Sequence, residues 1–136
     1  MCWLLNCYKT EWFELMDIFA WLLVGHLVGD WLFQNDWMAT GKKQKFFSWA
    51  GVSHFVIYTM TVVFTIYLFG VGRYNPAFYL ILGLLVFISH WIIDGTRIVD
   101  IWIQLYRQTD SVMMRVMVDQ TLHILVLAVL AGLILS

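Results

Sequence analysis

Charged residues are scarce in this chain of 136 residues. They make up 12% of it, whereas hydrophobic residues make up 62%. A soluble domain of this length cannot bury so much apolar surface. The two cysteines, Cys2 and Cys7, are too close together for a disulfide framework. The formal net charge of -1 leaves no basic surface for nucleic acid, so that partner is excluded. The sequence therefore predicts an integral membrane protein.

Four apolar segments are long enough to cross a bilayer as helices. A turn at 39–41 with lysines after it ends the first segment, and a glycine-containing stretch at 70–75 ends the second. Pro76, the only proline, suits the first turn of the third helix. We expect spans at about 16–37, 46–69, 76–96 and 112–135. The predicted fold class is all-α, an integral membrane four-helix bundle in a single domain, residues 1–136.

Two further segments are expected to lie along the membrane surface. The first fifteen residues interleave aromatic and charged side chains, and they lack the features of a cleaved secretory signal. We expect them to form an N-terminal interfacial segment. Residues 97–108 alternate apolar and charged side chains at helical spacing, which predicts a cytosolic amphipathic helix between the third and fourth spans. Asp110 or Ser111 is expected to cap the fourth span.

The basic residues predict the orientation. One side of the membrane would carry Lys42, Lys43, Lys45, Arg97, Arg107 and Arg115, and the other would carry Lys9 and Arg73. Cytosolic loops are enriched in lysine and arginine. We therefore expect a multi-pass protein with both termini on the outer side.

Histidine and aspartate recur at a spacing of four within the apolar segments. The residues are His26 and Asp30 in the first span, His54 in the second, His90 and Asp94 in the third, and Asp119 and His123 in the fourth. Residues four apart share one face of a helix. Counted from the cytosolic end of each span, all of them fall within a layer about 14 Å thick. Ionisable groups inside a membrane need partners, so we expect a single cluster.

Imidazole and carboxylate are ligands that zinc, manganese and iron accept. The expected ligands of a divalent metal, zinc before manganese or iron, are His26, His54, His90, Asp94, Asp119 and His123. One ion or two would fit this number of ligands. Asp30 is expected to be the catalytic base. An anionic headgroup would bind to Gln34, Arg97 and Arg115, and Arg115 would also offset part of the negative charge of the cluster.

The predicted function is metal-dependent hydrolysis of a lipid or lipid-linked substrate reached from the cytosolic leaflet. A proton or metal-ion transporter or channel is the first alternative. A structural or partner-binding membrane protein is the second, because polar side chains also join helices by hydrogen bonds, as His54 would. Gly25 and Gly29 are interpreted as a close-packing face. Membrane lipids are the expected partners, and homo-oligomers are compatible with the sequence.

Four separated blocks of the sequence carry a resemblance to a known family. The blocks are 26–39 with Lys42 and Lys43, the region of His54, 89–94, and 119–123. In this order they resemble an uncharacterised family of small bacterial and phage membrane proteins, DUF3307, over about residues 20–128. The resemblance implies a four-span protein of the bacterial inner membrane built on these histidines and aspartates. It implies no particular activity.

Overall fold

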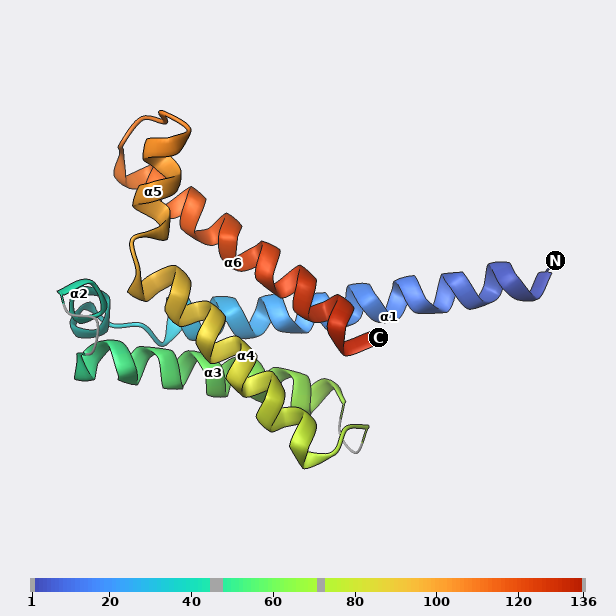
Figure 1. The fold of residues 1–136 in the computed structure, drawn as a ribbon. Helices are drawn as coiled ribbons and strands as arrows, with labels where there is room; N and C mark the ends of the chain where they lie inside the picture. The colour runs from blue at the N-terminus through green and yellow to red at the C-terminus, as the bar shows by residue number, and fades with distance from the viewer. Residues whose placement is uncertain (1, 45–47, 71–72, 136) are drawn as a thin grey trace.

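A computed structural model gives the fold, and it describes residues 2–44, 48–70 and 73–135 (Figure 1). All secondary structure elements in these ranges are helical, which confirms the predicted all-α class. In chain order they are α1 (Cys2–Leu27), the π-helical turn η1 (Val28–Leu32), α2 (Asp36–Gln44), α3 (Trp49–Phe69), α4 (Pro76–Gly95), α5 (Ile98–Leu105) and α6 (Val112–Leu135).

Four helical segments are long and apolar enough to cross a membrane. They are Glu14–Leu32, Trp49–Phe69, Pro76–Gly95 and Val112–Leu135. Large apolar side chains point outward from all four, and Met60, Phe64, Leu80 and Leu125 are each more than half exposed. Soluble monomers rarely expose apolar surface on this scale. The chain is a membrane protein.

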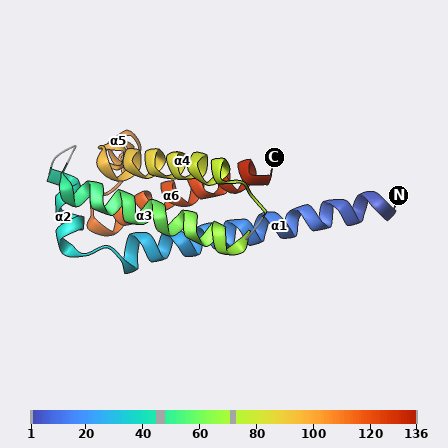
Figure 2. The same cartoon turned by 90° about the horizontal axis from the view of Figure 1, so that it is seen from below.

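The four long helices, α1, α3, α4 and α6, pack against one another, and we refer to them together as the bundle. Helix α1 packs against α3 and α6, and α4 packs against the same two helices. Helices α2 and α5 lie at one end of the bundle, and the connection between α3 and α4 lies at the other (Figures 1 and 2). The N-terminal part of α1 extends beyond that second end (Figure 2).

Two glycines bring α1 close to α3. A Cβ atom on Gly25 would lie 2.9 Å from the Cα of Val62, and one on Gly29 would lie 3.1 Å from the Cα of Tyr58. Both distances are shorter than ordinary van der Waals contact, so a larger residue at either position would separate the helices. This agrees with the close-packing face expected from the sequence.

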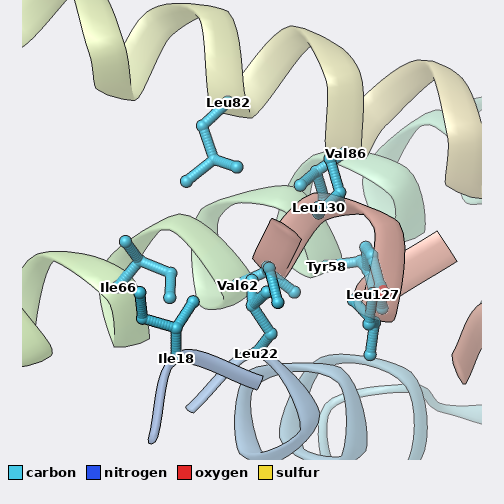
Figure 3. Close-up of a cluster of buried hydrophobic side chains, with 10 residues drawn as sticks. Ile18, Leu22, Tyr58, Val62, Ile66, Leu82, Val86, Leu127 and Leu130 are labelled. Carbon is cyan, nitrogen blue, oxygen red and sulfur yellow. The ribbon is translucent and has the colours of Figure 1, made fainter. Parts of the chain in front are cut away.

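A hydrophobic core fills the half of the bundle nearer the connection between α3 and α4 (Figure 3). Its fully or nearly fully buried side chains include Ile18 and Leu22 of α1, Val62 and Ile66 of α3, Leu82 and Val86 of α4, and Leu127, Leu130 and Ala131 of α6. In α1 and α4 these core residues come before the histidine and aspartate positions in the sequence, and in α3 and α6 they come after them. The polar side chains therefore gather in the other half, near α2 and α5.

The first span ends earlier than the 16–37 expected. The N–H of Phe33 donates to the carbonyl of Val28 at 3.0 Å, a bond across five residues that is typical of a π turn. Helix α2 then begins at Asp36, where the Asn35 side chain accepts the N–H of Met38 at 3.0 Å. The prediction of a turn at 39–41 was wrong, because α2 begins after the Asn35 cap and continues through those residues.

The remaining elements lie near their expected positions. Helix α3 begins at Trp49 after the Ser48 cap, somewhat later than the expected start at 46. Ser111 accepts the N–H of Met114 at 3.2 Å and so caps α6. The segment expected to form a separate N-terminal interfacial element is continuous with the first span, because α1 is one helix from Cys2 to Leu27.

Candidate metal centre

The structure gathers all four histidines and three aspartates, from all four membrane-length segments, in one place. They are His26 of α1, Asp30 of η1, His54 of α3, His90 and Asp94 of α4, and Asp119 and His123 of α6. The four histidines are at most 2% exposed. The side chains of Asp30 and Asp94 are 5% and 2% exposed, whereas that of Asp119 is 26% exposed. Asp119 is thus the most exposed member of the cluster.

Four side chains converge on one point. The Nε2 atom of His54 lies 2.9 Å from His90 Nε2, 3.2 Å from Asp94 Oδ2 and 3.3 Å from Asp30 Oδ1. His90 Nε2 lies 3.6 Å from Asp94 Oδ2. Nitrogen and oxygen ligands at about 2.0–2.1 Å in a tetrahedral zinc site are separated from one another by about 3.3–3.4 Å. The four measured distances lie on both sides of that value, so these residues can hold a metal ion.

The π turn positions Asp30 for this group. Gly29 and Asp30 are the buried residues of η1. Because Gly29 has no side chain, η1 approaches the backbone of α3 at Tyr58, one turn beyond His54. Asp30 consequently faces His54, while His26, one turn earlier in α1, faces a different set of partners.

A chain of hydrogen bonds orients His90. His123 Nδ1 donates to the backbone carbonyl of Asp119 at 2.9 Å, so its Nε2 atom is the acceptor. His90 Nδ1 donates to that atom at 2.7 Å. This arrangement leaves the lone pair of His90 Nε2 directed toward His54 and Asp94. Histidines that bind metals commonly donate their other ring N–H in this way.

His26 has a positioning role. The Gln120 side-chain amide donates to Asp30 Oδ2 at 3.0 Å and to Asp119 Oδ2 at 3.1 Å, so its oxygen accepts from His26 Nε2 at 2.9 Å. His26 Nδ1 then accepts from the Tyr58 hydroxyl at 3.1 Å. Both ring nitrogens are thus hydrogen-bonded, and the group formed by Asp30, His54, His90 and Asp94 does not include this residue. His26 therefore lies where it can orient the carboxylates of Asp30 and Asp119 through Gln120, and its expected role as a ligand stays a prediction.

Tyr58 and Gln120 are the two site residues that sequence reasoning did not assign. The Tyr58 ring stacks on His90 with ring centroids 3.5 Å apart and an angle of 6° between the planes. The sequence offered a signal for each, because Tyr58 follows His54 by four residues and Gln120 follows Asp119 directly. Both therefore lie on or beside a polar helix face.

A second group of ligands adjoins the first. It consists of Asp94, Asp119 and His123, and it shares Asp94 with the first group. One ligand atom of each residue lies within 4.8 Å of those of the other two, and His123 Nε2 lies 3.8 Å from Asp94 Oδ1. All the expected ligands except His26 thus belong to one group or the other, and Asp30 joins them.

The expected headgroup ligands lie at the same end of the bundle. Arg115 donates to the carboxylates of Asp100 and Asp110, the latter at 2.7 Å, and Arg97 lies 3.6 Å from Asp100. Arg115 was expected to offset the charge of the cluster, but these two carboxylates outside the cluster hold it. Gln34 is half-buried in the segment between η1 and α2.

Comparison with known proteins identifies a family and no individual relative. A search of curated proteins and a search of solved structures found no match. A family described as "Protein of unknown function (DUF3307)" matches residues 18–136. This range includes every residue of the cluster and confirms the resemblance noted from the sequence blocks. The chain belongs to the DUF3307 family.

Proposed function

We propose that this protein binds a divalent metal ion within the membrane and uses it to hydrolyse a lipid or lipid-linked substrate. The observation that supports metal binding is the convergence of His54, His90, Asp30 and Asp94 with separations of 2.9–3.6 Å. Two imidazoles and two carboxylates suit zinc, with manganese and iron as alternatives.

Hydrolysis requires a coordination position for water. Catalytic zinc sites commonly have three protein ligands and a water, whose pKa the ion lowers to about 7. His54, His90 and Asp94 would be the three ligands. Asp30 would give up the fourth position, since its Oδ2 atom is already held by Gln120 at 3.0 Å. Its Oδ1 atom would then accept the proton of the water as general base.

The substrate would arrive from the cytosolic interface. Arg97, Arg107 and Arg115 lie in or beside α5 and at the start of α6, and cytosolic segments are rich in such residues. The exposed side chains of Ile101 and Leu105 support a position of α5 along the membrane surface. This orientation has both termini outside, in the inner membrane of a bacterium. The Arg97 side chain, 80% exposed, is available to an anionic headgroup.

Proton transfer is a second candidate function. The ring nitrogens of His123, His90 and His54 follow one another at 2.7 Å and 2.9 Å, which suits proton movement along the chain. A path across the membrane, however, would have to continue through the hydrophobic core around Val62 and Val86. The chain of histidines therefore supports local proton transfer during hydrolysis more than transport.

Metal analysis of the protein purified in detergent tests the proposal. We expect at least one zinc ion per chain. His54→Ala should lose the ion, whereas His26→Ala should keep it, although both histidines are fully buried on neighbouring helices. Absence of stoichiometric metal, or equal loss from the two variants, would contradict the ligand assignment.

Turnover is tested separately from metal binding. Vesicles of phosphatidylethanolamine and phosphatidylglycerol would be incubated with the zinc-loaded protein, and products would be identified by mass spectrometry. Asp30→Asn should keep the ion and lower the rate by about 10²–10⁴-fold, the usual contribution of a general base. A metal-loaded Asp30→Asn variant with the wild-type rate would exclude Asp30 as the base.

A further inference from the structure

We infer that the cluster has a second cation site, formed by Asp94, Asp119 and His123 and joined to the first through the Asp94 carboxylate. This inference rests on the proposed metal site at His54 and His90. Its basis is that the two oxygens of Asp94 face different groups. Oδ2 lies 3.2 Å from His54 Nε2, and Oδ1 lies 3.8 Å from His123 Nε2.

A bridging carboxylate sets a suitable spacing for two ions. In two-metal sites the ions are about 3.5–4 Å apart and commonly share oxygen ligands. The Asp94 side chain is 2% exposed, so both of its carboxylate oxygens lie within the cluster. Each can therefore serve a separate ion without a change of rotamer.

Charge supports a second ion. The cluster contains three carboxylates, those of Asp30, Asp94 and Asp119. One divalent ion offsets two of these charges, and a second ion with a bound hydroxide offsets the third. Arg115, the arginine nearest to Asp119 in sequence, is held by Asp100 and Asp110 instead.

The two sites differ in exposure and in strength. The side chains of the first group are at most 5% exposed, whereas Asp119 is 26% exposed. His123 Nε2 also accepts a hydrogen bond from His90 Nδ1 at 2.7 Å, which an ion at this nitrogen must replace. The second ion should therefore bind more weakly and exchange faster than the first. With three protein ligands it retains positions for water or a substrate oxygen.

Titration of chelator-treated protein in detergent with Mn²⁺ tests the inference. Calorimetry should give two equivalents, the second at least about tenfold weaker, and the doubly loaded protein should give the electron paramagnetic resonance spectrum of a spin-coupled pair. Asp119→Asn should lose only the second equivalent and keep the first within about threefold. The control Asp110→Asn changes a carboxylate outside the cluster and should keep both.

The outcomes separate the two proposals. One equivalent in the wild type, with Asp119→Asn unchanged, would overturn the second site and leave the first standing. No equivalents would overturn both. If Asp119→Asn lost both ions while its circular dichroism and thermal unfolding matched the wild type, Asp119 would belong to the first site and the division into two sites would be wrong.

Discussion

The contact between α1 and α3 at Gly25 allows a prediction whose size follows from the structure. In Gly25→Ala the new Cβ atom would lie 2.9 Å from the Cα of Val62, where ordinary contact begins at 3.4 Å, so the helices must separate by roughly 0.5 Å. It would also lie 2.5 Å from Thr65 Oγ1, which can rotate away. Overpacking of this kind costs about 1–3 kcal/mol. We expect a net loss of about 1–2 kcal/mol, because alanine favours the helix over glycine by about 0.5–1 kcal/mol.

The same separation should weaken the proposed metal site. Binding constellations require their groups to lie within about 0.5 Å of the productive geometry. Gly25 is next to His26, which orients Asp30 through Gln120. We therefore expect zinc affinity to fall by about tenfold, measured by competition with a chelating dye.

Gly132→Ala provides the matched control. It makes the same substitution in α6, where no atom lies within 4 Å of the new Cβ. Reversible unfolding of both variants in mixed detergent micelles compares their free energies of unfolding. If Gly25→Ala were as stable as Gly132→Ala and bound zinc equally well, the close approach of α1 and α3 would not be what holds the site together.

Three further predictions concern the hydrogen bonds and the ion. Tyr58→Phe removes the hydroxyl that donates to His26 but keeps the ring, so the free energy of unfolding in detergent should fall by about 1–2 kcal/mol. The metal content should stay unchanged, and loss of metal would contradict this prediction. Gln120→Leu removes the hydrogen bonds from Gln120 to His26, Asp30 and Asp119, so the free energy of unfolding in the same assay should fall by more than about 2 kcal/mol. A smaller decrease would contradict the role of Gln120 in linking these residues. Lowering the pH should weaken metal binding, because only the neutral imidazole binds metal; equilibrium dialysis that found an affinity independent of pH would contradict histidine ligands.

Much of the cluster could be predicted from the sequence because the surroundings are apolar. A histidine or aspartate in the middle of a membrane-length helix must face the interior of the bundle and find a polar partner there. Residues of this kind at the same depth in the membrane therefore come together. This reasoning found His54, His90, Asp94 and His123. It held even for His54, which has no acidic residue four positions away in the sequence and whose acidic neighbours, Asp30 and Asp94, come from η1 and α4.

The individual roles could not be predicted, because they depend on ring orientation. His26 and His54 both lie on polar faces of apolar helices, but in the structure Gln120 and Tyr58 occupy both nitrogens of His26, whereas His54 Nε2 lies against His90 and Asp94. The sequence likewise gave no sign of the bond across five residues that forms η1. Helix α2 was missed although Asn35 and Asp36 form a capping signal, because Gly41 was interpreted as part of a turn.

The unequal interior of the bundle, apolar in one half and polar in the other, has a consequence for local unfolding. Side chains such as Leu22 and Val62 belong to a core that contains no histidine or aspartate, so they should remain packed whether or not a cation is present. The helix ends near α2 and α5 depend on the hydrogen bonds of the cluster and, in the proposed metal-bound form, on the charge of the ion. Removal of the ion should therefore increase amide exchange at those ends alone. A lipid could enter there while the opposite half keeps the four helices assembled.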